Sequence, residues 1–215
     1  MALVDHWPLF GLEVRTPRLV LRYPDDELGL ELVELAARGV HAPDTMPFTI
    51  PWTDDPPSAH LQHLWRNRAD WKPEQWHLQL VAVIDGEAVG TQGMTGEHFG
   101  TRRAIETGSW VGIAHQGQGI GKEMRAAMLH LAFVGLDAQL ATTAAWHDNA
   151  ASLAVTNALG YEPNGWTLEL RRDQPDRQLR FVMTRDRWET RRRDDIEIVG
   201  LDPCLSLFGA GDADR

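Results

Sequence analysis

The most constraining feature of this sequence is a glycine-rich loop that leads directly into a helical pattern at residues 115–133, HQGQGIGKEMRAAMLHLAF. Glycines occupy the alternate positions Gly117, Gly119 and Gly121, and apolar residues then recur at the spacing of one helix face. Glycine lets a ligand approach the backbone closely, and the first N–H groups of a helix have no partner within it. Because the helix dipole also favours negative charge there, the segment predicts a phosphate-binding loop.

The spacing of the glycines distinguishes among the kinds of phosphate-binding loop. A dinucleotide-binding loop, G-x-G-x-x-G, would need a glycine where this sequence has Lys122. A P-loop would need a glycine at Gln116 and a serine or threonine at Glu123, so its Mg²⁺-binding hydroxyl is missing. The alternative to a specialised loop is a glycine-rich turn before an ordinary amphipathic helix.

The order Gln116-x-x-Gly119-x-Gly121 resembles the Q/R-x-x-G-x-G/A signature of the GCN5-related N-acetyltransferases, the GNAT family. In that family the loop binds the pyrophosphate of an acyl-coenzyme A. The resemblance implies that backbone N–H groups of the loop bind the acyl-coenzyme A, which is the acyl donor, and that Lys122 adds a positive charge at the rim of the loop. The loop residues that it assigns to donor binding are Gln116, Gly117, Gln118, Gly119, Ile120, Gly121 and Lys122.

The resemblance implies two further parts of the donor site. The strand at residues 110–113 is expected to splay from its neighbour and leave backbone groups of Val111 and Ile113 free for the pantetheine amides. The pattern N-x-x-S at Asn149 and Ser152 is similar to that of the ribosomal-protein-alanine branch of the family. It implies that Asn149 contacts the pantetheine arm and that Ser152 is the catalytic acid near the thioester sulfur. The alternative is that Asn149 or Asp148 only caps a helix.

Acyl transfer to an amine also requires a base that takes a proton from the ammonium. Glu106 is our catalytic candidate, because members of the family often hold a glutamate on the strand before the splay; the alternative is a solvent-facing strand residue. Glu123 is expected to cap or form a salt bridge rather than catalyse. Water is another option, and the weaker side-chain options are His115, His98 and Glu97.

The composition and net charge limit the classes of binding partner that we expect for this protein. The formal charge of −10 argues against a nucleic-acid partner and is compatible with a cationic acceptor. The single cysteine, Cys204, excludes an intrachain disulfide and is expected to be packed rather than nucleophilic. Neither a membrane span nor a secretory signal is visible, so we expect a cytoplasmic protein. No metal site is predicted, because His60 and His63 lack a third ligand and read as surface residues.

The order of the predicted elements indicates the fold class. It runs strand, helix, helix, three strands, helix, strand, helix and two strands, with a hairpin turn at Asp85-Gly86 and a proline-rich loop at residues 40–57. We predict an α/β (α+β) GNAT fold, with a mixed, mostly antiparallel sheet flanked by helices. Residues 1–186 would form the acyltransferase domain and residues 187–215 a C-terminal extension, with a last strand and an irregular tail between positions 194 and 208.

We therefore expect an acyl-CoA-dependent N-acyltransferase that transfers the acyl group to a primary amine by direct attack in a ternary complex. Acetyl-CoA is the default donor. The sequence also resembles actinobacterial members described as succinyltransferase-like, and a succinyl donor would need a cation, for which Arg66, Arg68 and Lys72 are possible sources. The acceptor is a small-molecule amine or a protein N-terminus, and a homo-oligomer is possible. The alternative function is a non-catalytic acyl-CoA sensor.

Overall fold

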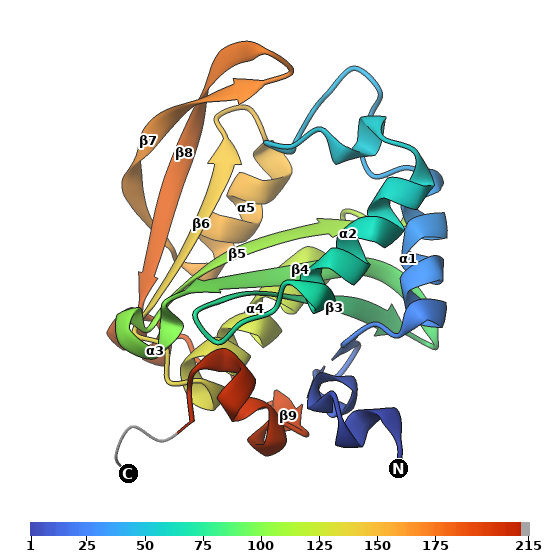
Figure 1. The fold of residues 1–215 in the computed structure, drawn as a ribbon. Coiled ribbons are helices and arrows are strands. Elements are labelled where there is room, and N and C mark those ends of the chain that lie inside the picture. Colours follow the sequence, from blue (N-terminus) through green and yellow to red (C-terminus); the bar gives the residue numbers. More distant parts are fainter. Residues whose placement is uncertain (212–215) are drawn as a thin grey trace.

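The computed structural model describes residues 1–211 and is built on a nine-stranded sheet with the strand order β7-β8-β6-β5-β4-β3-β2-β1-β9 (Figure 1). Neighbouring strands are antiparallel except β5 and β6, which are parallel. This confirms the predicted mixed, mostly antiparallel sheet. The strands are β1 (Glu13–Arg15), β2 (Val20–Arg22), β3 (Gln75–Ile84), β4 (Glu87–Glu97), β5 (Ala104–Val111), β6 (Leu140–Trp146), β7 (Glu162–Arg171), β8 (Gln174–Thr184) and β9 (Glu197–Val199).

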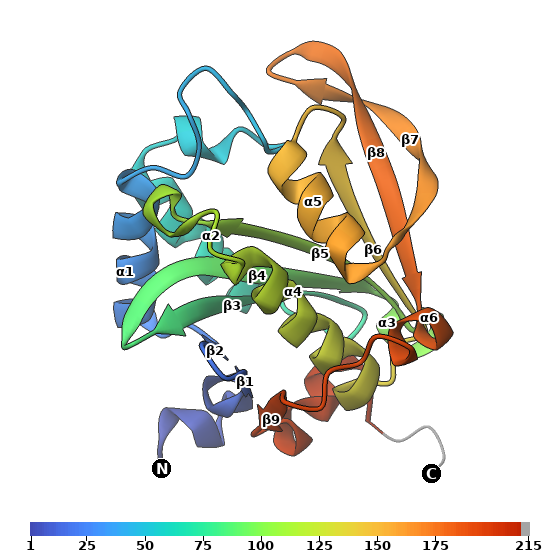
Figure 2. The ribbon, with the colours of Figure 1, turned by 180° about the vertical axis from the view of Figure 1, so that it is seen from behind.

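Helices cover both faces of the sheet. The helices α1 and α2 lie on the face seen in Figure 1, and α4 and α5 lie on the opposite face, seen in Figure 2. None of the helices within residues 1–211 has the length and apolarity needed to cross a bilayer. The helices are α1 (Asp26–Ala37), α2 (Pro57–Ala69), α3 (Phe99–Arg102), α4 (Ile120–His130), α5 (Ala150–Leu159) and α6 (Arg185–Glu189), and a single π-helical turn (Leu131–Gly135) extends α4.

Local sequence explains most element boundaries. The side chain of Asp25 caps α1 by accepting the N–H of Leu28 at 2.8 Å. The predicted turn between β3 and β4 places Asp85 and Gly86 in the left-handed region, which suits a two-residue hairpin. The helix α2 begins at Pro57 without a side-chain cap, because proline suits the first helical position, where no N–H partner is needed.

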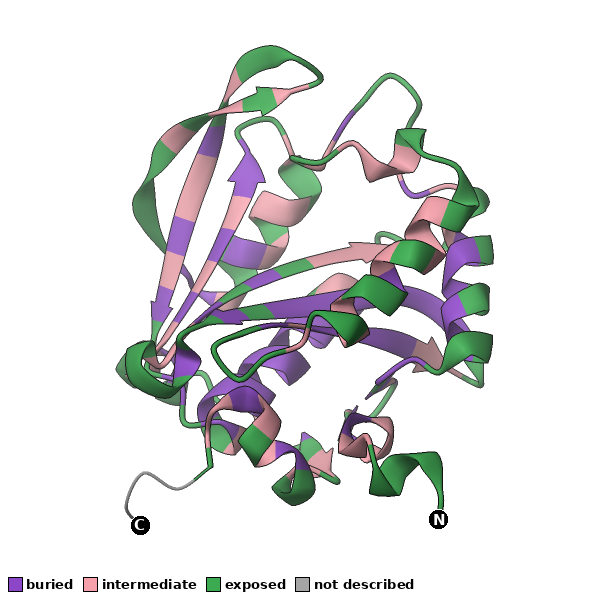
Figure 3. Ribbon diagram, in the orientation of Figure 1, coloured by how far each residue is buried: buried purple, intermediate pink, exposed green. Residues whose placement is uncertain are grey.

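The main hydrophobic core lies between the sheet and the helix α4. Almost all of α4 is buried (Figure 3), including Met124, Met128 and Leu129. A smaller cluster joins Leu28, Leu32 and Leu35 of α1 to the other face of the sheet. Because α4 follows the glycine loop directly, this packing anchors the C-terminal side of the loop in the core.

The strands β5 and β6 diverge part of the way along their length. They pair only from Ala104 and Leu140 to Glu106 and Thr142, whereas β5 stays paired with β4 as far as Val111. The gap between them is visible in Figures 1 and 2. Along a strand of an antiparallel pair, the main-chain groups of successive residues point alternately toward the partner strand and away from it. The Gly112 N–H donates to the Val89 carbonyl, so Gly112 and every second residue before it point toward β4. The main-chain groups of Ser109 and Val111 therefore point away from β4, toward the gap.

The described part of the C-terminal segment packs against the N-terminal edge of the sheet. The predicted last strand is present as β9, which pairs with β1, while positions 212–215 of the predicted extension lie outside the described residues. Cys204 and Phe208 are fully buried, and burial raises the pKa of the Cys204 thiol to about 11, so the expectation of a packed thiol is confirmed. The indole of Trp76 donates to the Phe208 carbonyl at 3.2 Å, and their rings are 4.9 Å apart.

Substitution of Phe208 tests whether the C-terminal segment packs against Trp76 as described. Truncation to Phe208→Ala is expected to lower the free energy of unfolding by about 3–5 kcal/mol, because it leaves a cavity beside Trp76. Urea denaturation followed by tryptophan fluorescence measures the change. The control, Leu170→Ala on the exposed face of β7, should change stability by less than about 0.5 kcal/mol. Equal effects of the two substitutions would show that the segment does not pack as described.

Candidate active site

The glycine loop presents a row of backbone donors. Residues 116–119 are exposed, and Gly117 and Gly119 have φ values of 74° and 79°, a conformation that side chains with a Cβ rarely adopt. Within the described chain, the amide N–H groups of residues 117–122 find no acceptor, and the helical bonds begin with Glu123 N–H to Gly119 carbonyl at 3.1 Å. This arrangement suits an anion with several oxygen atoms, as a pyrophosphate has.

The side chain of Gln116 fixes the start of the loop. Its amide nitrogen donates to the Val40 carbonyl at 2.7 Å and to the Val111 carbonyl at 2.8 Å. The loop is thus joined both to the end of β5 and to the segment after α1. Gln116 therefore positions the start of the loop, while the exposed Lys122 forms no ion pair among the described residues.

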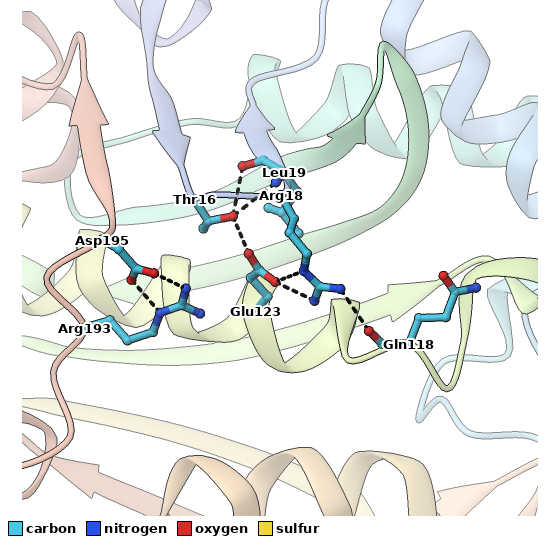
Figure 4. A network of polar contacts seen from close by, with 7 residues as sticks. All are labelled: Thr16, Arg18, Leu19, Gln118, Glu123, Arg193 and Asp195. Carbon is cyan, nitrogen blue, oxygen red and sulfur yellow. Dashed lines mark hydrogen bonds and ion pairs between the residues drawn. The ribbon is translucent and has the colours of Figure 1, made fainter.

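A buried carboxylate fixes the other end of the loop. Glu123 accepts a hydrogen bond from Thr16 at 2.7 Å and one from Arg18 Nε at 2.6 Å, as Figure 4 shows. Arg18 also donates to the Gln118 carbonyl at 3.1 Å, so it joins the β1–β2 turn to the loop. Burial favours a raised pKa of Glu123, but the bonds from Thr16 and Arg18 outweigh it and lower the pKa. The expectation that Glu123 forms a salt bridge is confirmed.

The gap between β5 and β6 begins beside the loop. The carbonyl of Val111 is bonded to Gln116, while its N–H points toward the gap. The expectation that the backbone N–H of Ile113 is free is wrong, because this N–H donates to the Gly39 carbonyl at 3.0 Å. The chain leaves the sheet at Gly112 and enters a 3₁₀ turn there, so Ile113 no longer belongs to the strand edge. Ser109, which the sequence did not single out, takes its place on the gap-facing edge.

The predicted catalytic residues lie at the two faces of this gap. Ser152 is in the first turn of α5, and its N–H donates to the side chain of Asn149 at 3.1 Å, so Asn149 caps the helix. Trp110 packs against the hydrophobic cluster formed with α1. Because side chains alternate between the two faces along a strand, Glu106, four residues earlier, lies on the same face of the sheet as Trp110, opposite to α5. Glu106 is the last residue of β5 paired with β6, is half-exposed and lies 3.6 Å from Arg180.

A buried polar cluster lies on the α4 and α5 side of the gap. Arg125 of α4 donates to the hydroxyls of Thr156 at 3.1 Å and Ser109 at 3.2 Å. The hydroxyls of Tyr161 and Thr107 lie 3.5 Å apart nearby. Sequence reasoning missed this cluster, although one signal was available: Arg125 lies between Met124 and the apolar run at residues 126–129, in the part of the helix that is expected to be buried.

Aromatic and histidine rings lie on the opposite face of the sheet. The Trp52 ring is 4.9 Å from that of His60 and 5.5 Å from that of Trp110. Burial lowers the pKa of His60 to about 4, helped by the nearby His63, so its ring is neutral at pH 7. The prediction of a surface histidine pair is therefore wrong, because α2 turns both rings toward the sheet. No group of three metal-binding side chains forms within residues 1–211.

The Glu123 network predicts a pH-dependent stability. Because the folded-state pKa lies below the ordinary value of 4.5, the ionised carboxylate stabilises the fold above that value, and this contribution is lost as the pH falls through the folded-state pKa. Glu123→Gln should lower the free energy of unfolding by about 1–3 kcal/mol at pH 7. Urea denaturation should show this difference shrinking at pH 3. A difference independent of pH would contradict the role, and Glu97→Gln, in the exposed pair with Arg102, is the control.

Comparisons with known proteins agree with this geometry. The family model described as the acetyltransferase (GNAT) domain matches residues 18–162. Among solved structures, the RimL ribosomal L7/L12 α-N-protein acetyltransferase in complex with coenzyme A has a TM-score of 0.66 at 19% identity, covering 80% of this chain and 97% of that one. A putative ribosomal-protein-serine acetyltransferase from Vibrio cholerae has a TM-score of 0.62 at 19% identity, with the same 80% and 97% coverage.

A third structure, the microcin C7 self-immunity acetyltransferase MccE in complex with acetyl-CoA and AMP, has a TM-score of 0.60 at 16% identity and covers 78% of this chain and 93% of that one. At these identities the structural matches establish the fold. The family model spans the β2 strand, the glycine loop, the gap and α5, which together form the site described above. This chain therefore belongs to the GNAT acetyltransferase family and is an enzyme of the N-acetyltransferase class.

Proposed function

We propose that the protein transfers an acyl group from an acyl-coenzyme A to a primary amine, by direct attack of the amine on the thioester. One observation carries this proposal: the N–H groups of residues 117–122, which have no acceptor within residues 1–211, lie at the N-terminus of α4, next to the gap between β5 and β6. The loop suits the pyrophosphate, and the gap-facing N–H groups of Ser109 and Val111 suit the carbonyl groups of the pantetheine arm.

The thioester supplies an activated acyl carbon, and the protein supplies the proton transfers. Glu106 takes a proton from the acceptor ammonium on the α1 and α2 face. The nitrogen then forms a bond to the acyl carbon as the bond from that carbon to sulfur breaks. Ser152 donates its hydroxyl proton to the departing sulfur and regains one from the second N–H of the new amide nitrogen. Glu106 and Ser152 would thus act from opposite faces of the same gap.

The acceptor and the acyl group are finer points of the same proposal. The charge of −10 suits a cationic amine, either a small molecule or a protein N-terminus. The neutral wall formed by Trp52, His60 and Trp110 lies on the same face as Glu106 and suits an apolar or planar group of the acceptor. Acetyl-CoA and succinyl-CoA are the donors to compare, and we place the reaction in the cytoplasm, where the lone Cys204 thiol stays reduced.

Donor binding is the first test. Free CoA should raise the melting temperature of the protein, with a stabilisation of about 2.7 kcal/mol when its concentration is 100 times the Kd. Gly119→Val should abolish the shift, because valine does not tolerate the left-handed conformation of this residue. The control, Gly86→Val, has the same conformational demand but lies in the distant β3–β4 turn, so it should lower stability and keep the shift. A shift with ATP and none with CoA would contradict the proposal.

Turnover is the second test. Release of free thiol from acyl-CoA in the presence of a panel of primary amines should depend on both catalytic residues. Glu106→Gln and Ser152→Ala should each lower kcat by about 10²–10⁴-fold while CoA binding, measured by calorimetry, is retained. The controls Glu87→Gln and Ser58→Ala change exposed residues away from the gap and should keep full activity. Tight CoA binding with no thiol release on any amine would identify a non-catalytic sensor instead.

A further inference from the structure

Arg125 is a buried cation that the proposed reaction does not yet use. Its side chain is enclosed between α4, α5 and β5, and the residue is only 3% exposed. Two of its nitrogen atoms donate to the neutral hydroxyls of Thr156 and Ser109. Its Nε is buried and finds no acceptor among the residues that the structure describes. Within that part of the chain no carboxylate pairs with it, and the titratable side chain that acts on its pKa is that of Tyr161.

A guanidinium in this position is energetically unfavourable. Buried charges in proteins are normally paired, because two hydroxyl groups do not replace the solvation that an ion loses on burial. Desolvation accordingly lowers the pKa of Arg125, but arginine remains charged at neutral pH. A residue of this kind is most easily understood when the ligand brings the missing anion.

The position of Arg125 indicates where such an anion would come from. Arg125 lies five residues after Ile120, the first residue of α4, and therefore deeper in the protein than the phosphate-binding loop. Its partner Ser109 lies two residues before Val111 on the edge of β5 that faces the gap. A donor held by the loop and extended along this edge brings its acyl end toward Ser109, while its phosphates remain outside at residues 117–122.

Other cations are less suited to this role. Arg68 is bonded to Asp26 and to the Pro24 carbonyl, both at 2.8 Å. Arg66 is exposed on α2 and Lys72 follows that helix, which lies on the face of the sheet opposite to α4 and α5 (Figures 1 and 2). These were the cations that the sequence suggested for a charged acyl chain. Arg125 lies on the same face as α4 and α5, and its Nε has no hydrogen-bond acceptor within residues 1–211.

We propose that Arg125 binds the terminal carboxylate of the acyl chain, so that the preferred donor is a dicarboxylic monoacyl-CoA such as succinyl-CoA. The planar guanidinium offers parallel N–H groups that match a carboxylate, including the Nε that has no acceptor within residues 1–211. Ser109 holds the guanidinium at the strand edge, and Thr156 holds it against α5. This inference rests on the proposed acyl-CoA chemistry and specifies its acyl group.

The test compares two donors that differ only in charge at the end of the chain. Succinyl-CoA and butyryl-CoA have acyl chains of equal length, with a carboxylate in one and a methyl group in the other. Calorimetry on the wild-type protein should show succinyl-CoA binding about 10–100-fold more tightly, which corresponds to one charge-assisted hydrogen-bonded pair. Arg125→Met should remove this preference. Lys122→Met, at the rim of the loop, is the matched control and should weaken both donors equally, leaving their ratio unchanged.

The possible outcomes separate this inference from the function on which it rests. If both donors bind and the wild type shows no preference, or if Arg125→Met keeps the preference, Arg125 does not read the acyl group and the acyltransferase proposal stands. If no CoA derivative binds, the function itself is wrong. The melting temperature of ligand-free Arg125→Met checks its folding. It should equal or exceed that of the wild type, because the substitution removes a buried charge that has no carboxylate partner in the described part of the chain. If that variant does not fold, Arg125→Lys should still reduce the preference, since lysine lacks the planar pair of donors.

Discussion

The site depends on one local event in the sheet, the early end of the pairing between β5 and β6. After Glu106 and Thr142 the two strands separate, although each keeps its other neighbour. Unpaired strand edges inside a protein are unfavourable, and the chain satisfies only some of the groups exposed here. The Thr143 hydroxyl donates to the Thr107 carbonyl at 3.0 Å, and the Gln116 amide donates to that of Val111. The groups that remain are suited to an extended ligand with its own amides.

The loop at the wide end of this gap is held at both ends, although its N–H groups have no acceptor within residues 1–211. Gln116 attaches its start to β5, and the pair formed by Arg18 and Glu123 attaches its end to the β1–β2 turn. Bonds of this kind fix the direction of the N–H groups before an anion arrives, which reduces the entropy lost on binding. The residues that hold the loop are thus as important to the site as the glycines that form it.

Burial gives the two faces of the gap different electrostatic character. On the α1 and α2 face, desolvation keeps His60 and His77 neutral by lowering each pKa to about 4, so the aromatic wall carries no charge there. On the α4 and α5 face, Arg125 remains charged because arginine does not lose its proton at neutral pH. Burial therefore leaves a neutral wall on one side and, on the other, a cation without a carboxylate partner among the residues that the structure describes.

The sequence by itself determined the elements whose signals are local, namely the glycine loop before α4 and the Asp85-Gly86 hairpin. The motif of the loop indicated the family, and the order of the predicted strands and helices indicated the fold. Only the tertiary structure decided where β5 leaves β6, which moved the free edge from Ile113 to Ser109. It alone paired β9 with β1, joined Arg18 to Glu123 across 105 positions and enclosed Arg125 among residues that, within positions 1–211, include no acidic partner for it. Turns and helix starts depend on residues that are neighbours in the sequence, so short sequence patterns can predict them. The contacts named here join segments that are distant in the sequence, and they depend on how the whole sheet is packed.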